Sequence, residues 1–125
     1  MIMNVSNIID MSWLETLKNK EHIRSVIYTW QGGVEAGGAS ADVLVGAAVP
    51  SGKLPDTITY DIKDYPSTAN FGNEEKNLYQ EDIYVGYRYF ETFAPERVQF
   101  PFGFGLSYTD FSMEVKHAEI LGFGV

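Results

Sequence analysis

Residues 30–35 combine side chains that can hold a neutral ring bearing C–H and O–H groups. Trp30, Gln31 and Glu35 flank the paired glycines Gly32 and Gly33. An indole offers a flat apolar face on which the C–H bonds of a sugar ring can stack, and a neighbouring loop supplies hydrogen bonds to the hydroxyl groups. Trp30, Gln31 and Glu35 are therefore the candidate substrate-binding residues.

Each of these three side chains also has a structural interpretation. Trp30 closes an apolar segment and is more often a buried residue at a strand end, and Gln31 can equally belong to a turn. Glu35 stands where a helix is expected to begin, and there the helix dipole stabilises a carboxylate by about 0.3 to 1 kcal/mol. Both interpretations stay open for this loop, with helix capping the commoner role of such a glutamate.

Three short motifs that carry chemistry in other proteins each lack a required feature here. Residues 103–105 read Gly-Phe-Gly like the start of a dinucleotide-binding fingerprint, but Tyr108 replaces the third glycine. Residues 52–53 read Gly-Lys like a phosphate-binding loop, but Leu54 replaces the required Ser or Thr. Ser40 follows the expected helix start, whereas a nucleophilic serine elbow needs a sharp strand-to-helix turn. No catalytic residue is assigned.

Composition limits the partners and cofactors of the chain. It has 125 residues with a net charge of -8 and no cysteine, and His22 and His117 lie far apart. The negative charge argues against nucleic acid and anionic membranes as partners, and no metal or organic cofactor is predicted. No apolar run reaches the roughly 18 residues that span a bilayer, and the N-terminus lacks the basic start of a signal peptide, which favours a cytoplasmic location.

The first half of the chain predicts an α/β arrangement. Ser25–Trp30 is β-branched and aromatic, as expected for a central parallel strand covered on both faces, and residues 1–5 predict a neighbouring strand. Ser12 and Glu15 have capping-box spacing ahead of a helix to about Lys20. Small residues over 35–45 predict a second helix that packs closely on the sheet, although Gly37 and Gly38 weaken it by about 1 kcal/mol each.

The second half predicts strands and loops. Residues 57–60 read as an edge strand after Pro55, and residues 61–76 as a long polar loop. The aromatic residues of 83–90 predict strands on either side of Gly86. Residues 100–108 predict tight turns, and the alternation of apolar residues over 111–115 predicts a further strand.

Four segments in order resemble one known family. Trp30–Leu44 is similar to W-x-G-x-E-x-G-x-A-x-A-D-x-L, Pro50–Pro55 reads P-S-G-K-L-P, Glu81–Phe90 is similar to E-x-I-Y-V-G-Y-R-Y, and Pro101–Thr109 to P-F-G-x-G-L-S-Y-T. These motifs are typical of the C-terminal α/β domain of family 3 glycoside hydrolases of the β-glucosidase and β-xylosidase type. The chain resembles a fragment of that domain.

The resemblance implies where the chemistry lies. Family members hydrolyse β-glucosides or β-xylosides with retention by means of two carboxyl groups. The nucleophile belongs to an N-terminal barrel, and the acid/base glutamate, where it lies in the α/β domain, precedes the first strand of this chain. Neither position exists here, so we expect no activity of the chain alone. No cofactor or metal is implied.

The resemblance also divides the chain. Residues 1–108 are expected to form part of the C-terminal α/β domain, a partial parallel sheet with two flanking helices and a strand-rich aromatic tail. Residues 109–125 are expected to begin a fibronectin-like β-sandwich. Open strand edges predict self-association or pairing with the missing parts of the enzyme, through which the carbohydrate substrate would be bound. The alternative function is a non-catalytic carbohydrate-binding or assembly module.

Overall fold

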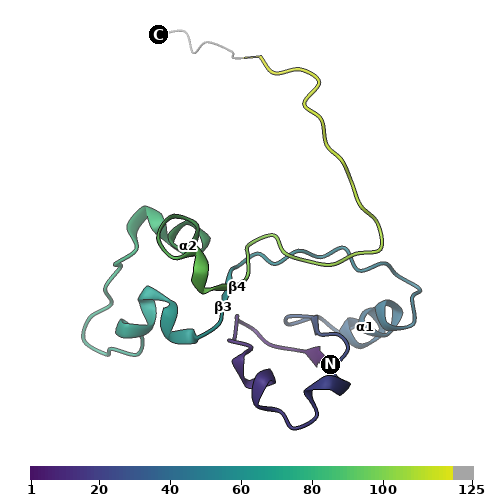
Figure 1. The fold of residues 1–125 in the computed structure, drawn as a ribbon, viewed down its shortest axis with the longest axis horizontal. Coiled ribbons are helices and arrows are strands. Elements are labelled where there is room, and N and C mark those ends of the chain that lie inside the picture. Colours follow the sequence, from purple (N-terminus) through teal and green to yellow (C-terminus); the bar gives the residue numbers. More distant parts are fainter. Residues whose placement is uncertain (120–125) are drawn as a thin grey trace.

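The computed structural model describes residues 1–119 and arranges them in two lobes, with the C-terminal segment extending away from both (Figure 1). The first lobe comprises residues 1–49 and the second lobe residues 57–100. The strands are β1 (Ile2–Met3), β2 (Ile27–Tyr28), β3 (Ile58–Thr59) and β4 (Val98–Phe100), and the α-helices are α1 (Ala36–Leu44) and α2 (Tyr87–Phe93). Short 3-10 helices lie at Ser12–Thr16, Lys20–His22, Ile62–Asp64, Pro66–Asn70, Asp82–Tyr84 and Pro95–Arg97.

The first lobe contains the predicted parallel pair. Strands β1 and β2 run parallel, with Met3 opposite Tyr28, and the amide of Thr29 donates to the carbonyl oxygen of Met3 at 2.9 Å. The parallel direction is thus confirmed. Strand β2 is shorter than the predicted Ser25–Trp30. Its residues are only half-buried, because within the described residues it pairs with one strand and not two.

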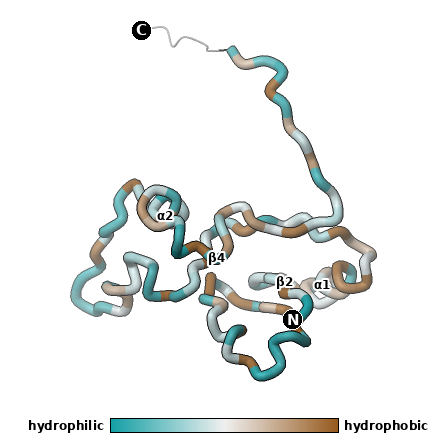
Figure 2. Tube along the Cα trace, in the orientation of Figure 1, coloured by the Kyte–Doolittle hydropathy of each residue, from teal (hydrophilic) through white to brown (hydrophobic). Residues whose placement is uncertain are grey.

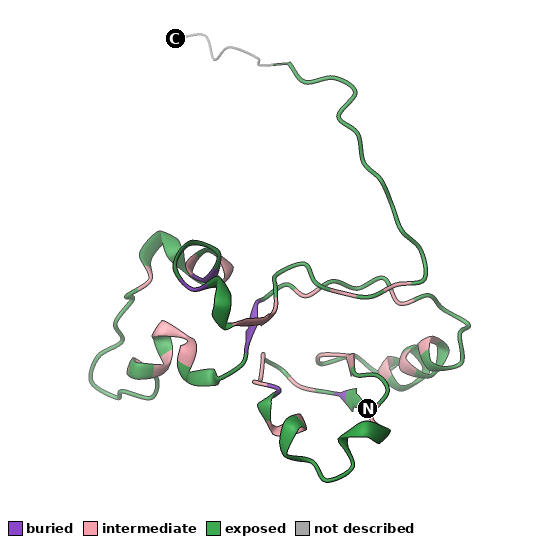
Figure 3. Ribbon diagram, in the orientation of Figure 1, coloured by how far each residue is buried: buried purple, intermediate pink, exposed green. Residues whose placement is uncertain are grey.

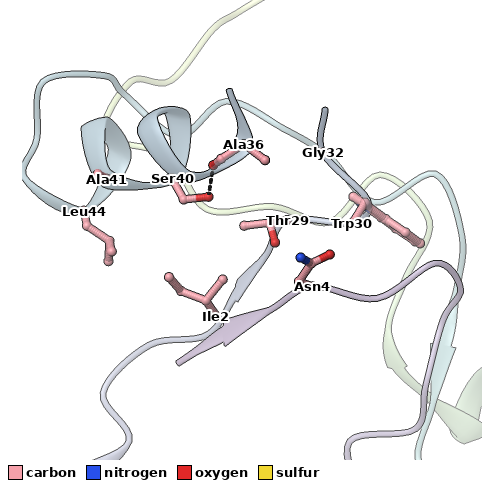
Figure 4. Close-up of a pocket in the computed structure, with 10 residues that line it drawn as sticks. Ile2, Asn4, Thr29, Trp30, Gly32, Ala36, Ser40, Ala41 and Leu44 are labelled. Atoms are coloured by element: carbon pink, nitrogen blue, oxygen red, sulfur yellow. Dashed lines mark hydrogen bonds between the residues drawn. The ribbon is translucent and has the colours of Figure 1, made fainter. Parts of the chain in front are cut away.

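Helix α1 confirms the predicted helix after the glycine loop. It begins after Glu35 and runs through both Gly37 and Gly38. None of its residues is buried, so close packing of α1 on the sheet, as predicted from its small residues, is wrong. Instead, α1 lies beside the strand pair with open space between them (Figure 4).

The predicted helix from Ser12 to about Lys20 is wrong in type and length. A 3-10 helix covers Ser12–Thr16, and a second begins at Lys20. Ser12 does not cap a helix, because its amide and hydroxyl both donate to the carboxylate of Asp10. The first 3-10 helix has Met11 as its N-cap, with no capping side-chain hydrogen bond.

The second lobe is built on an antiparallel pair. Ile58 in β3 faces Phe100 in β4, with an irregular register before Thr59. The strand predicted over 57–60 is therefore confirmed for β3, whose two residues are both buried. The pairing continues outward, since the amide of Leu54 donates to the carbonyl oxygen of Phe104 at 2.8 Å. The predicted loop over 61–76 contains two 3-10 helices at its start.

The strands predicted over residues 83–90 are wrong. Gly86, at φ 66°, precedes helix α2, and a 3-10 helix covers Asp82–Tyr84. Helical spacing places Phe90 and Phe93 on successive turns, where each meets an aromatic partner. The ring of Phe90 meets Tyr65 edge-on at 5.2 Å, and that of Phe93 lies 4.8 Å from Tyr84. Aromatic packing of the helix therefore outweighs the intrinsic β-preference of these residues.

Few residues are buried (Figure 3). A central cluster consists of Met3, Met11 and Ile58, and partly buried apolar residues surround it, namely Val5, Ile8, Ile9, Trp13, Leu14, Tyr28, Leu54 and Phe100. This cluster joins the two lobes, since it draws on both. Apolar segments are distributed along the whole trace (Figure 2) and many of their side chains are exposed.

The segment after residue 106 carries no regular structure as far as it is described. Phe111, Met113 and Val115 are exposed by 87, 96 and 84%, and no strand lies between residues 107 and 119. The strand predicted over 111–115 is therefore wrong. The remainder of the expected β-sandwich segment, residues 120–125, lies outside the described residues.

Candidate functional site

The loop after β2 bends sharply at Trp30. This residue has φ 54°, in the left-handed region, which a bulky side chain rarely adopts. Such a conformation costs of the order of 1–3 kcal/mol and is found mainly at functional sites. The loop then closes on α1, because the amide of Ala36 donates to the carbonyl oxygen of Gly33 at 3.0 Å.

A cavity of about 290 Å³ lies between α1 and the β1–β2 pair, at the carboxyl end of the strands (Figure 4). Ile2 and Leu44 lie at one end of it, and Asn4 and Trp30 at the other. The wall from α1 is formed by small residues, and the full lining is Ile2, Asn4, Thr29, Trp30, Gly32, Ala36, Gly37, Ser40, Ala41 and Leu44. Ligands of parallel α/β folds bind at this edge of the sheet.

The two hydroxyl groups that line the cavity already donate hydrogen bonds to backbone carbonyl oxygens. Thr29 Oγ1 donates to the carbonyl oxygen of Met3 at 3.0 Å, and Ser40 Oγ donates to that of Ala36 at 2.8 Å. Each oxygen keeps lone pairs that can accept a further hydrogen bond. The exposed amide of Asn4 adds both donors and an acceptor.

The ring of Tyr28 packs against the ring of Trp30. The two ring centroids lie 4.6 Å apart in a tilted arrangement. The Tyr28 hydroxyl accepts from the amide of Ile9 at 3.2 Å and donates to the carbonyl oxygen of Asn7 at 2.6 Å. Burial raises the pKa of this hydroxyl, and its two hydrogen bonds fix the position of the ring.

The structure separates the three candidate binding residues. Trp30 lines the cavity, whereas Gln31 and Glu35 are exposed and lie outside its lining. Glu35 is the N-cap of α1, as its position predicted, but its side chain makes no capping hydrogen bond. Sequence reasoning missed Asn4, Thr29 and Ser40. The sequence signal for Asn4 was its position two residues after Ile2, because side chains two apart in extended backbone lie on the same face.

A second, larger hollow adjoins the first. It has a volume of about 830 Å³ and lies between β2, α1 and the two segments that run between the lobes, residues 49–54 and 104–106. Apolar side chains such as Val43, Val49 and Phe104 line it. An open apolar hollow of this size next to a two-stranded sheet is typical of a surface that further protein covers.

The surroundings of Asp10 favour the charged form of its carboxyl group. A general acid needs a raised pKa, but hydrogen bonding from Ser12 lowers the pKa of Asp10. Within residues 1–119, no group of three or more His, Cys, Asp or Glu side chains is arranged to hold a metal ion. None of the helices in that range is long and apolar enough to cross a lipid bilayer.

Most of this chain matches a small part of the sequence of longer curated relatives. A β-glucosidase of Ruminococcus albus is 53% identical over 115 residues, which are 92% of this chain and 12% of the relative. β-Glucosidase A of Butyrivibrio fibrisolvens is 50% identical over 121 residues, which are 94% of this chain and 14% of the relative. The chain thus spans about one eighth of the length of these enzymes.

Solved structures agree with this match. A β-glucosidase of Paenibacillus barengoltzii superposes with a TM-score of 0.86 at 60% sequence identity. The superposition covers 98% of this chain and 13% of the Paenibacillus enzyme. β-Glucosidase 3B of Thermotoga neapolitana, solved in complex with glucose, superposes with a TM-score of 0.71 at 40% identity, over 87% of this chain and 15% of its own.

The family follows from a direct match over more than half of the sequence. Residues 1–87 match the glycosyl hydrolase family 3 C-terminal domain, including the strand pair, the glycine loop and helix α1. The motifs at residues 30–44, 50–55 and 81–87 fall within this range. The chain belongs to the glycosyl hydrolase family 3 C-terminal domain family.

Proposed function

We propose that this chain supplies part of the C-terminal α/β domain of a retaining glycoside hydrolase that acts on β-glucosides or β-xylosides. The observation that carries the proposal is the match to the Paenibacillus barengoltzii β-glucosidase, which spans 98% of this chain at 60% identity. Because the match covers only 13% of that enzyme, the two catalytic carboxylates come from the rest of the polypeptide. The chain alone is inactive.

Open strand edges support pairing with the missing parts of the enzyme. Ile27 and Thr29 donate to β1, so Ile2 and Asn4 direct their backbone groups to the opposite edge. A parallel sheet is normally covered on both faces and needs more than two strands, so a further strand beside β1 would complete it.

The loop after β2 would face the sugar site in the complete enzyme. Trp30 supplies the apolar platform, while Gln31 and Glu35 are exposed and free to reach hydroxyl groups outside the cavity. Residues 1–108 form the α/β portion, and residues 109–125 lead toward a fibronectin-like segment. The exposed apolar residues at 111, 113 and 115 support this role, because they need a partner to bury them.

A segment exchange tests the proposal. The matched segment of the Paenibacillus barengoltzii enzyme is replaced by residues 1–125, and hydrolysis of a chromogenic β-glucoside is measured. We expect an active chimera, no activity from the chain alone, and none from the enzyme with the segment deleted. An inactive but folded chimera would contradict the proposal and favour the alternative, a non-catalytic carbohydrate-binding or assembly module. Light scattering on the chain alone tests self-association, since a stable monomer would contradict it.

A further inference from the structure

We propose that Tyr79 is a proteolytic processing site, cut by an endoprotease whose specificity pocket takes an aromatic side chain, and that the two resulting chains stay assembled. The site lies between the 3-10 helices Pro66–Asn70 and Asp82–Tyr84. Water adds across the peptide bond between Tyr79 and Gln80. The carbonyl carbon of Tyr79 takes the oxygen and becomes a carboxylate, while the nitrogen of Gln80 takes both protons and becomes an ammonium group. The inference does not depend on the proposed function.

The segment that contains Tyr79 is open to a protease. Residues 71–80 are all exposed, and Tyr79 is exposed by 88%. The segment lies on the side of the second lobe that faces away from helix α1 (Figure 1), and it is drawn as a continuous exposed loop (Figure 3). Exposed loop tips are the preferred sites of proteolytic cleavage.

The backbone around Tyr79 can enter a protease cleft without breaking native hydrogen bonds. An extended peptide binds such a cleft much as a strand is added to a sheet edge, through its main-chain N–H and C=O groups. Residues 76–80 carry no helix, strand or turn. Within residues 1–119, the backbone of residues 77–80 makes no hydrogen bond. Its donors and acceptors are therefore available to the protease.

The ordered backbone on either side confines the cut to this segment. Gly72 and Asp82 lie in the left-handed region, at φ 79° and 48°, so the chain turns at both ends of the segment. Beyond these turns, the amide of Phe71 donates to the carbonyl oxygen of Thr68 at 3.4 Å. On the other side, the amide of Tyr84 donates to the carbonyl oxygen of Glu81 at 2.8 Å.

Tyr79 is better placed than its neighbours to fill the specificity pocket. Phe71 is exposed by 91%, but the turn at Gly72 follows it directly, where a protease needs extended backbone. Lys76 has its amide bound to the side chain of Asn73, which disfavours a trypsin-like cut. The chain on both sides of Tyr79 is free of such turns as far as residue 80. An aromatic-specific protease is therefore the class that fits.

Contacts across the cut hold the two chains together. Strand β3 belongs to the first chain and β4 to the second, and the two strands pair antiparallel. The ring of Tyr65 meets that of the buried Phe90 edge-on at 5.2 Å. Asp64 and Arg97 form a salt bridge of 3.0 Å. Cleavage after residue 79 therefore opens a loop and leaves these contacts in place.

Limited digestion of the full chain with chymotrypsin tests the site. We expect the fragment 1–79 and a fragment that begins at Gln80, both identified by mass, besides cuts after Tyr108 or Phe111 in the exposed tail. The two fragments should elute together from a sizing column and separate in urea. A first internal cut within residues 1–70 or 83–104, or separation of the fragments without urea, would overturn the inference.

A matched pair of variants tests the choice of residue. Tyr79 and Tyr108 are similarly exposed, by 88 and 84%. We expect Tyr79→Gln to slow the cut after residue 79 at least about tenfold, because an apolar pocket loses its aromatic ring, and Tyr108→Gln to leave that cut within about twofold. Equal rates of this cut in the two variants would contradict the assignment.

A destabilised variant tests whether the folded chain is the substrate. A β-carbon on Gly105 would overlap with the carbonyl oxygen of Gly52, so Gly105→Ala weakens the fold outside the segment. Cleavage of the folded loop keeps its rate within about twofold in this variant, whereas cleavage through global unfolding rises at least about fivefold with the unfolded population. A rise of that kind, with the loss of stability measured in parallel, would overturn the inference.

Discussion

The α-carbon of Gly105 lies so close to the carbonyl oxygen of Gly52 that a β-carbon on residue 105 would overlap with that oxygen. The contact is part of the pairing between residues 52–54 and 103–105, where the Lys53 ammonium also donates to the carbonyl oxygen of Gly105. We predict that Gly105→Ala lowers the free energy of unfolding by about 1–3 kcal/mol, since backbone must move to relieve the overlap. Gly52→Ala is the control, because a β-carbon there meets no atom within 4 Å. Urea unfolding of both variants decides the point, and equal midpoints would contradict it.

The glycine loop supplies a second matched pair. A β-carbon on Gly32 would overlap with that of Ala36, whereas one on Gly33 meets nothing within 4 Å. We expect Gly32→Ala to destabilise the chain by about 1–3 kcal/mol and to displace the neighbouring Trp30. Thermal unfolding measures the first effect, and the near-ultraviolet circular dichroism of the indole measures the second. A normal spectrum in Gly32→Ala, or the same loss in Gly33→Ala, would refute the explanation.

Tyr65 predicts an alkaline limit of stability. Its hydroxyl donates to the carbonyl oxygen of Thr57 at 2.5 Å and accepts from the amide of Thr59 at 3.3 Å, and burial raises its pKa above 10.0. The unfolded chain therefore loses this proton at lower pH than the folded chain, so stability falls as the pH rises above about 10. Tyr65→Phe should reduce that slope and cost about 1–3 kcal/mol at neutral pH.

The control for this prediction is Tyr60→Phe, which alters an exposed tyrosine in the same lobe. It should change neither the slope nor the neutral stability by more than about 0.5 kcal/mol. Tyr28 also has a raised pKa because of burial, so part of the alkaline dependence should persist in Tyr65→Phe. Identical pH profiles for Tyr65→Phe and the original chain would argue against the assigned role.

Asp10 predicts that stability falls at acidic pH. The hydrogen bond from the Ser12 hydroxyl, aided by the Ser12 amide and opposed by desolvation, lowers the pKa of Asp10 below 3.8. The folded state thus favours the carboxylate, and its stabilising effect disappears as the pH falls below about 4. We expect Ser12→Ala to flatten the stability profile between about pH 2 and pH 4. A chemical-denaturation series across that range tests this, with Ser67→Ala on an exposed serine of the second lobe as the unaffected comparison.

Sequence reasoning succeeded where local chemistry and tertiary structure agree. The glycines at 32 and 33 mark the end of one element, and the small residues after Glu35 form helix α1 as predicted. It failed at Tyr87–Phe93, because aromatic residues favour strands unless packing against Tyr65 and Tyr84 rewards helical spacing. Ser12 failed as a cap for a similar reason, since Asp10 competes for its donors.

The candidate site was predictable only in part. Trp30 ends the strand predicted over Ser25–Trp30 and lies close to paired glycines, so local sequence was enough to identify it. Asn4 follows β1, Thr29 follows β2 and Ser40 lies in α1, and no local pattern connects them. Their proximity depends on the pairing of β1 with β2 and on how α1 folds back beside them.

The pairing of residues 52–54 with residues 103–105 also sets an order for biosynthesis. Lys53 and its partner Gly105 are 52 positions apart. A ribosome adds about 5–20 residues per second, so Leu54 and Ile58 are made roughly 2 to 10 seconds before their partners in residues 100–104. During translation these apolar residues are therefore exposed before their partner strand has been made, and such exposed surface makes a nascent chain prone to aggregate.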